Sequence, residues 1–315
     1  MNNRLIRFTN LSKIFFGISL AIMLIGLICN IIFGTQLDIQ FSGGSYLSYS
    51  YVGNIDKNAL DDVIQESTKA KVTTTVSSNI LSNTDTQDAY TVKVQFAGTK
   101  AITPDEQSNL TKALVKAYPD AKFKVEESKA IESTMGFKFL MKCLAAVAIA
   151  CVLMVFYVTI RFRRIGGLSA GVMALVALFH DVFVIYFMYV IFQMPIDSNF
   201  IAVVLMILGY SLNDTIVIYD RVREERRKMG SKEEIGYVFD YSATKVIKRT
   251  IFTSITTLVA IGTVLVVSIV FNISSVTSFA LPMMIGVISG CYSSICIAGP
   301  LWVIWQRYKK KTGKA

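Results

Sequence analysis

Histidine is nearly absent from this sequence, because only His180 occurs among its 315 residues. The longest polar stretch, residues 34–136, contains neither histidine nor cysteine. It therefore lacks the side chains that most metal sites and nucleophilic active sites require. Its glycine pair, Gly43 and Gly44, does not extend into the GxGxxG of a dinucleotide-binding loop. We expect a module that makes contacts by surface and shape, with no enzyme activity, no cofactor and no metal.

Charge is also scarce, since charged residues make up 17% of the chain and hydrophobic residues 53%, with a mean hydropathy of +0.51. Such a composition indicates an integral membrane protein. The net charge is +10. Residues 34–136 hold 10 Lys and 13 Asp and Glu, which leaves 22 of the 32 basic and 9 of the 22 acidic residues for the apolar part. A nucleic-acid-binding protein would place its basic excess on a soluble module, so we expect no nucleic-acid partner.

Six apolar stretches are long enough to cross a membrane, which takes about 20 residues. They are Ile14–Phe33, Cys143–Ile160, Gly166–Ile191, Phe200–Tyr219, Ile251–Ile273 and Phe279–Trp305. The first is not followed by a small-x-small cleavage site and is interpreted as an uncleaved anchor. All five cysteines lie in these runs without metal or disulfide spacing, and we expect them to be small buried hydrophobes: Cys29, Cys143, Cys151, Cys291 and Cys296.

Basic clusters at the ends of the spans predict the orientation. They are Arg4, Arg7 and Lys13; Arg161, Arg163 and Arg164; Arg221, Arg223, Arg226, Arg227 and Lys228; and Lys309, Lys310 and Lys311. Six spans place all four clusters on one face, which is expected to be cytoplasmic together with both termini, the connector 221–248 and the tail 307–315. The two short loops expected on the opposite face, 194–199 and 272–275, contain no Lys or Arg.

Residues 34–136 are predicted to form one external domain between the first span (within 1–33) and the other five (within 137–306). Alternating or β-branched runs predict four strands, and apolar stripes predict two helices. In chain order these are strand Ser45–Val52, helix Asp56–Ser67, strands Lys71–Ile80 and Ala89–Phe96 around a turn at Ser82–Asp88, helix Pro104–Tyr118 and strand Ala121–Glu126. The β-α-β-β-α-β order is ferredoxin-like. The predicted fold class is thus a polytopic α-helical membrane protein with six spans and one α+β external domain.

Ionisable residues inside membrane spans are costly and are functional candidates by default. Asp214 lies in the inner half of the fourth span, where Tyr210 and Ser211 precede it on the same helix face and could hydrogen-bond to it. Arg249 opens the fifth span from the same side, and a guanidinium has the reach to meet that carboxylate. The alternatives are a shallow carboxylate wetted from the cytoplasm and an arginine whose head lies among lipid phosphates.

Other polar groups in the spans have two interpretations each. His180 and Asp181 in the third span suit a proton relay or a structural hydrogen-bonded pair. Hydroxyls after Arg249 could line a wet path or bond to helix carbonyls: Thr253, Ser254, Thr256 and Thr257. Small residues are expected to serve helix packing: Gly166, Gly167, Gly171, Gly209, Gly286 and Gly290. A buried carboxylate whose charged form is favoured when a guanidinium approaches could couple an ion gradient to movement.

Four motifs in chain order carry a family resemblance. They are FSGGS (Phe41–Ser45), FHD (Phe179–Asp181), GYSLNDTIVIYDRVREE (Gly209–Glu225) and RTIFTSITTL (Arg249–Leu258). Together they resemble the SecF members of the SecD/SecF family, within the resistance-nodulation-division superfamily. Gln40 stands where the family has Asp before its Phe, and Ser48 and Ser50 occupy a region where it has an acidic residue.

The resemblance implies a subunit that works with SecD and uses the ion-motive force, of H⁺ or Na⁺, to assist protein translocation through SecYEG in the bacterial plasma membrane. It implies Asp214 and Arg249 as the ion-coupling pair. Asn213, Thr215, His180 and Asp181 would support the ion path, and Phe41, Gly43 and Gly44 would form the turn after the first span. Implied partners are SecD, SecYEG, YajC and the unfolded translocating polypeptide.

Two other functions remain open from the residues. A stand-alone exporter of small molecules or lipids would usually carry twelve spans and two large external domains in one chain. A membrane receptor would account for the external domain but would leave Asp214 without a role.

Overall fold

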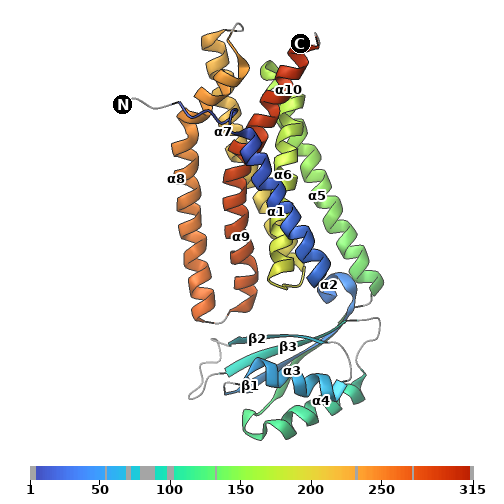
Figure 1. Ribbon diagram of the computed structural model, residues 1–315. Coiled ribbons are helices and arrows are strands. Elements are labelled where there is room, and N and C mark those ends of the chain that lie inside the picture. The colour runs from blue at the N-terminus through green and yellow to red at the C-terminus, as the bar shows by residue number, and fades with distance from the viewer. Residues whose placement is uncertain are drawn as a thin grey trace.

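The computed structural model describes residues 5–53, 55–68, 72–78, 89–97, 103–131, 133–230, 233–271 and 273–312. A helical bundle forms one part of the molecule and a sheet with two helices forms the other (Figure 1). Within the described residues, six helices are long and apolar enough to cross a membrane, as predicted. They are α1 (Ser12–Phe33), α5 (Ser133–Arg161), α6 (Gly167–Ile191), α7 (Ser198–Met229), α8 (Ile235–Val270) and a sixth made of α9 (Ser274–Ser293), the π-helical η3 (Ser294–Ala298) and α10 (Gly299–Lys311).

The fourth and fifth spans extend well beyond their apolar windows, into the predicted connector 221–248. Helix α7 continues past Tyr219 to Met229, and α8 already begins at Ile235. The added turns are polar, and hydropathy does not detect them. Their residues are good helix formers that pair along the helix, as Arg221 does with Glu225 at 2.6 Å. The connector is therefore a helical hairpin.

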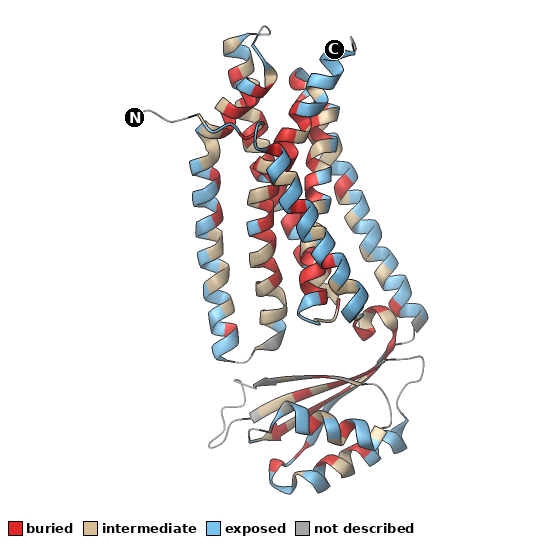
Figure 2. Cartoon of the chain, viewed as in Figure 1, coloured by how far each residue is buried: buried red, intermediate tan, exposed pale blue. Residues whose placement is uncertain are grey.

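The six spans divide into three inner and three outer ones. Between 50% and 67% of the apolar window is buried in α6, α7 and the sixth span, against 11% in α1, α5 and α8. Figure 2 shows this difference as red inner helices beside pale-blue outer ones. The outer helices therefore leave broad apolar faces for lipid or for partner chains.

The external domain is a four-stranded antiparallel sheet in the order β2-β3-β1-β4, which confirms the ferredoxin-like topology. Its strands are β1 (Gly44–Val52), β2 (Val72–Ser78), β3 (Ala89–Ala97) and β4 (Lys124–Ile131), and its helices are α3 (Lys57–Thr68) and α4 (Pro104–Ala117). The predicted turn at Ser82–Asp88 lies outside the described residues. Figure 1 shows the sheet between these two helices and the bundle.

The last strand begins later than the predicted Ala121–Glu126. Pro119–Ala121 form a short 3-10 turn, η1, and Lys122 adopts a left-handed conformation with φ of 49°. Such a backbone cannot enter a strand ladder, so pairing with β1 starts at Lys124. The sequence pattern missed this because η1 buries Ala121 and resembles the apolar start of a strand.

The core of the domain comes from the sheet face that α3 and α4 cover. Leu47, Tyr49 and Tyr51 of β1 are buried there, against Leu60 of α3 and Leu114 of α4. Their alternate positions along β1 follow from the two-residue repeat of a strand. A capping box at Thr103 and Glu106, with Pro104 at the first helical position, fixes the start of α4.

The FSGGS motif forms the elbow between the bundle and the sheet. Helix α2 (Ile39–Ser42) is followed by Gly43 and Gly44, which have φ of 75° and 133° and so form the predicted glycine-dependent turn. Phe41 is buried and stacks on Phe139 of α5 at 5.6 Å between ring centroids.

A buried carboxylate, Asp38, holds this elbow together. It accepts hydrogen bonds from the backbone N–H of Gln40 at 2.8 Å and from Nε2 of Gln95 in β3 at 2.7 Å. Its own N–H donates to the carbonyl of Ile196 in the loop before α7 at 3.0 Å. Asp38 thus ties the end of the first span to the sheet and to the neighbouring loop.

Replacing Gly44 by Ala should destabilise the external domain. A Cβ at this position would lie 2.3 Å from the backbone carbonyl oxygen of Phe96, on top of the strain of a positive φ. Thermal unfolding should show a loss of about 1–3 kcal/mol or more. Gly53→Ala is the matched control, because Gly53 also has a positive φ but a Cβ there would meet nothing described within 4 Å. Equal effects of the two substitutions would contradict the clash.

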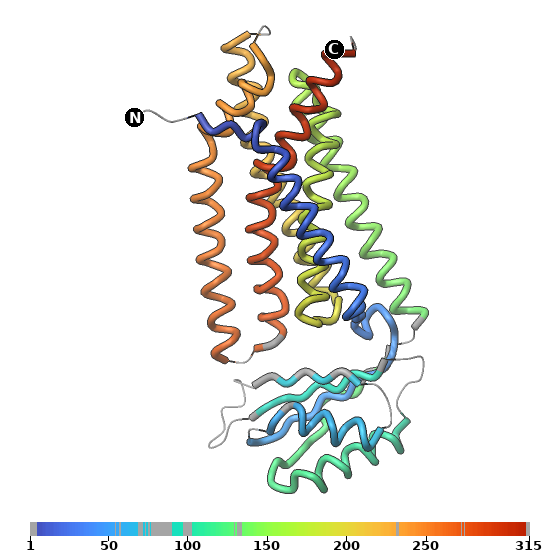
Figure 3. Tube along the Cα trace, viewed as in Figure 1, coloured from blue at the N-terminus to red at the C-terminus, as the bar shows by residue number. Residues whose placement is uncertain are grey.

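The chain ends mark one end of the bundle (Figure 3). The basic residues of the α5–α6 turn, of the α7 end and of the α10 end lie there too, as the alternating directions of the spans require. The external domain lies at the opposite end. This arrangement matches the shared face that the charge pattern predicts.

Candidate functional site

Asp181 is the centre of a polar layer inside the bundle. Helix α6 places it against α7 and α9, and its side chain is fully buried. Its carboxylate accepts hydrogen bonds from the hydroxyls of Ser211 at 2.8 Å, Ser289 at 2.6 Å and Ser293 at 2.7 Å. The Nδ1 atom of His180 lies 3.3 Å from the same carboxylate. A carboxylate with this many partners ties three helices together and fits the structural interpretation of the pair.

The layer continues along α7 and η3. Thr215 donates to the hydroxyl of Ser294 at 3.0 Å, and Ser294 donates to the carbonyl of Ser211 at 2.9 Å. This π-helical segment begins at Ser294, and such segments shift the hydrogen-bond pattern of a helix by one residue. Thr215 therefore supports the layer around Asp181.

Two glycines allow α9 to approach α7 closely, as the GxxxG spacing predicts. An added Cβ would lie 2.6 Å from Ile207 at Gly286 and 3.0 Å from Ser211 at Gly290. Gly209 behaves differently, because a Cβ there would meet no described atom within 4 Å. No described residue of this chain therefore packs closely against Gly209, and its packing role stays a prediction.

Asp214 is the contrasting carboxylate. Its side chain is 3% exposed, and its Oδ2 atom has no hydrogen-bond partner among the described residues. The two neighbours predicted to bind it are engaged elsewhere: Ser211 donates to Asp181 at 2.8 Å, and Tyr210 donates to Ser254 on α8 at 3.2 Å. That prediction is corrected because the two side chains turn toward other helices.

The surroundings of Asp214 are weakly polar. Cys291 on α9 lies near Asp214, and its thiol contacts the hydroxyl of Ser254. Thr250 on α8 is buried, and in the described part of the chain its hydroxyl has no partner. Asn213 is exposed, on a different side of α7 from Asp214. An ionised carboxylate is costly in such a site unless a cation or a proton compensates it.

The predicted contact between Asp214 and Arg249 is absent from the ion pairs of the described residues. Arg249 is exposed, whereas Thr250 and Ser254 on the same helix are buried. Successive helical residues differ by about 100° in direction, so α8 cannot turn Arg249 inward while it buries Thr250 against the bundle. The guanidinium therefore faces away from the carboxylate.

Most of the predicted hydroxyls of α8 donate hydrogen bonds to backbone carbonyls of the same helix. Thr253 donates to the carbonyl of Thr250 at 2.9 Å, and Thr256 and Thr257 donate to that of Thr253 at 2.9 Å. Among the described residues, only Ser254 of the predicted set forms a hydrogen bond to another helix. Together with Arg249, the exposed Thr253 and Thr256 form a polar strip on the outer face of α8.

Sequence reasoning missed four residues of these networks: Asp38, Ser289, Ser293 and Ser294. A signal was present for the serines, which interrupt an apolar span at spacings of four and one. These spacings place Ser289 and Ser293 on one helix face. The role of Asp38 depends on Gln95, which is far away along the chain, and could not be read from the sequence.

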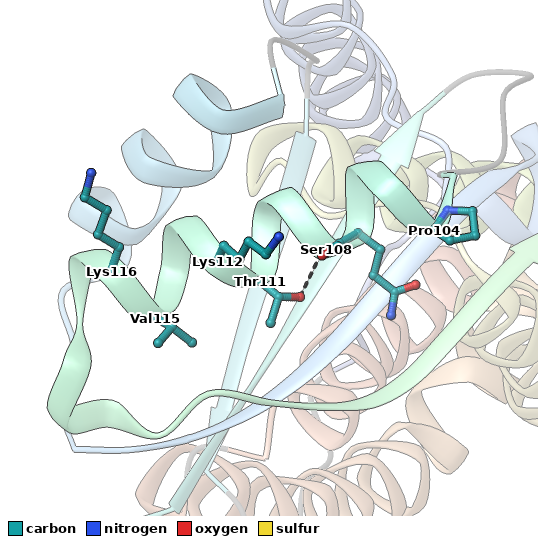
Figure 4. A pocket seen from close by; sticks show the side chains of 7 residues that line it. Pro104, Ser108, Thr111, Lys112, Val115 and Lys116 are labelled. Carbon is teal, nitrogen blue, oxygen red and sulfur yellow. Dashed lines mark hydrogen bonds between the residues drawn. The ribbon is translucent and has the colours of Figure 1, made fainter.

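The external domain has a separate open pocket of about 640 Å³ beside α4. Figure 4 shows lining side chains that include Pro104, Ser108, Thr111, Lys112, Val115 and Lys116. Thr111 donates to the backbone carbonyl of Gln107 at 2.7 Å. The lining has lysine ammonium groups and hydroxyls beside the exposed Val115. Such a mixture of polar and apolar groups suits a surface that contacts another protein chain.

Comparison with known proteins identifies the family. The family described as "Protein export membrane protein SecD/SecF, C-terminal" matches residues 110–308. The protein translocase subunit SecF of Sebaldella termitidis is 33% identical over 277 residues, covering 88% of this chain and 84% of that protein. SecF of Petrotoga mobilis is 32% identical, covering 98% of this chain and 99% of that protein.

Longer relatives contain this chain as one part. The protein translocase subunit SecDF of Bacillus subtilis is 30% identical over 98% of this chain, which spans 39% of that protein. The crystal structure of a Thermus SecDF, described as a translocon-associated membrane protein, matches 96% of this chain with a TM-score of 0.76 and 24% identity, over 39% of its own length. That likeness confirms the fold. The chain belongs to the SecD/SecF family of protein export membrane proteins.

Proposed function

We propose that this chain is a SecF subunit, which works with SecD in the bacterial plasma membrane and uses an ion gradient to assist protein translocation through SecYEG. The observation that carries this proposal is Asp214, a buried carboxylate at the contact of α7, α8 and α9, one oxygen of which has no hydrogen-bond partner among the described residues. Such a group is stable only while a proton or a cation accompanies it. H⁺ or Na⁺ is the proposed companion, and no covalent step is involved.

Arg249 is the proposed second member of the coupling pair. It lies on the outer strip of α8, so a rotation of this helix would bring its guanidinium nearer to Asp214 and release the bound ion. Helix α8 is an outer helix with 11% of its apolar window buried, so most of that window is exposed in this chain. Asn213, Thr215 and the hydroxyls around Asp181 would support the ion path.

A SecD partner would complete the assembly. The outer faces of α1, α5 and α8 are largely exposed, and this chain spans only 39% of the fused relatives. SecD would cover part of these faces and the strip at Arg249, and YajC and SecYEG are further proposed partners. The bundle end with both termini and the arginines would face the cytoplasm, and the external domain would meet the emerging polypeptide outside.

The direct test is protein export into vesicles that contain SecYEG, with SecD and this chain added separately or together. Export should rise under an imposed gradient only when both are present, and it should fall when the gradient is collapsed. Separate H⁺ and Na⁺ gradients identify the ion. Stimulation of export by this chain without SecD would contradict the proposal that it works only together with SecD. Transport of a small molecule by this chain alone would favour the function of a stand-alone exporter.

A further inference from the structure

An arginine-lined pocket lies at the end of the bundle opposite the external domain. Its volume is about 710 Å³, and it forms where α5 ends, where the short 3-10 turn η2 (Arg163–Ile165) begins α6, and where α7 continues past its apolar window. Six of its nine lining residues are arginines: Arg161, Arg163, Arg164, Arg223, Arg226 and Arg227. Six guanidinium groups around one cavity repel one another unless anions compensate them.

One carboxylate of this chain holds two of these arginines in place. Arg161 and Arg223 share the carboxylate of Asp220, at 3.0 Å and 2.9 Å. Both also lie near the ring of the buried Phe162, with distances of 5.6 Å and 5.8 Å from guanidinium carbon to ring centroid. Asp220 and Phe162 therefore fix one wall of the pocket.

Three other arginines of the pocket remain uncompensated. The structure gives the side chains of Arg163, Arg164 and Arg227 no ion pair or hydrogen bond with any described residue. Glu224, the acidic residue of the lining, is already engaged by Arg221 at 2.6 Å and by Lys228. Arg163, Arg164 and Arg227 thus present positive charge that no carboxylate of the described residues neutralises.

The surroundings of the pocket select a lipid over a soluble anion. Its lining includes Ile160, an exposed residue in the last turn of the apolar span α5, and Ile165 in the following turn. Helix α5 is an outer helix, so the exposed Ile160 lies at the end of an apolar face that this chain leaves uncovered. An anion that enters here has arginines at its charged end and an apolar helix below it.

We propose that this pocket binds the phosphate diester headgroup of an anionic phospholipid. Arg163, Arg164 and Arg227 contact the phosphate oxygens, and the acyl chains lie along the outer face of α5. Arginine suits this role because its planar donors match phosphate oxygens in pairs. Basic pockets between spans at the cytoplasmic side are a recurring site for such headgroups. The site is separate from Asp214 and does not depend on the proposed coupling.

The test is native mass spectrometry of the full chain in detergent, titrated with phosphatidylglycerol, cardiolipin or zwitterionic phosphatidylethanolamine. The triple variant Arg163→Gln, Arg164→Gln, Arg227→Gln should bind the anionic lipids about tenfold or more weakly than the parent chain. The matched control, Lys309→Gln, Lys310→Gln, Lys311→Gln, removes three exposed charges at the same end of the bundle and should bind like the parent chain. Circular dichroism and the melting temperature establish that both variants are folded.

Competition with inorganic phosphate and with glycerol phosphate separates the two sources of the anion. Neither should displace the lipid at millimolar concentration, because neither supplies acyl chains. Equal weakening in both triple variants, binding of phosphatidylethanolamine as tight as that of phosphatidylglycerol, or full displacement by inorganic phosphate would each overturn the proposal. An Arg→Lys version of the triple variant should recover part of the affinity, since it restores charge without paired donors.

Discussion

Asp214→Asn is expected to abolish the ion-gradient-dependent stimulation of export while the protein still inserts and folds. The substitution keeps the size of the side chain but removes its ability to gain and lose a proton. Because Oδ2 of Asp214 has no partner among the described residues, no hydrogen bond to this oxygen is lost. Thermal unfolding should therefore change by less than about 1 kcal/mol, whereas the gradient-dependent part of export in vesicles should disappear.

Asp220→Asn is the matched control for that experiment, because it removes one carboxylate from the same helix, α7. Asp220 forms ion pairs with Arg161 and Arg223, and the side chains of all three residues are about one third exposed to solvent. Ion pairs that are this exposed contribute little to stability. This variant should keep gradient-dependent export. Full stimulation in Asp214→Asn would remove the coupling role, and loss of export in both variants would show that the assay reports helix integrity.

Asp181→Ala should have the largest effect on stability, with a loss of about 3–5 kcal/mol. The hydroxyls of Ser211, Ser289 and Ser293 would lose their common acceptor inside the bundle, and a cavity would remain. Buried donors without acceptors carry the full cost of desolvation. The measurement is the melting temperature of the purified chain, together with protease resistance of the bundle.

Asp181→Asn is the milder comparison, since it keeps the volume and one acceptor oxygen. It should destabilise less than Ala, because serine hydroxyls can rotate to accept from the amide. A melting temperature unchanged in Asp181→Ala would contradict the role of this carboxylate in joining α6, α7 and α9. The opposite behaviour expected at Asp214, stable but inactive, distinguishes a structural carboxylate from a coupling one.

Much of the architecture can be predicted from the sequence because it depends on local periodicity. The apolar runs predict all six spans, and the alternation of Ser45–Val52 and Ala89–Phe96 predicts two strands, which pair in the structure. Span ends are less predictable, because hydropathy does not register helical turns made of Arg and Glu such as those after Tyr219. The start of β4 depends on the left-handed Lys122, for which the sequence carries no signal.

The polar site is only partly predictable, since it depends on how each helix is rotated. Asp181 and Asp214 are both intramembrane carboxylates in the sequence, and nothing local indicates that one has several donors and the other has an unpaired oxygen. The outward direction of Arg249 likewise follows from which face of α8 packs, as shown by the buried Thr250 and Ser254. Predicting these contacts would require knowing how α6, α7, α8 and α9 are rotated against one another.

The attachment of the external domain has a mechanical consequence. Gly44, where the chain enters the sheet, is paired with Ile131, where it leaves, so both connections meet the domain at a single corner. The sheet is therefore joined to the bundle through the chain at one end of β1 and β4. Strand β1 has nine residues and is about 30 Å long, so a turn of roughly 10° at the corner moves its far end by about 5 Å. A small tilt of α1 against α5 would thereby displace the far end of β1 by several times the movement at the corner.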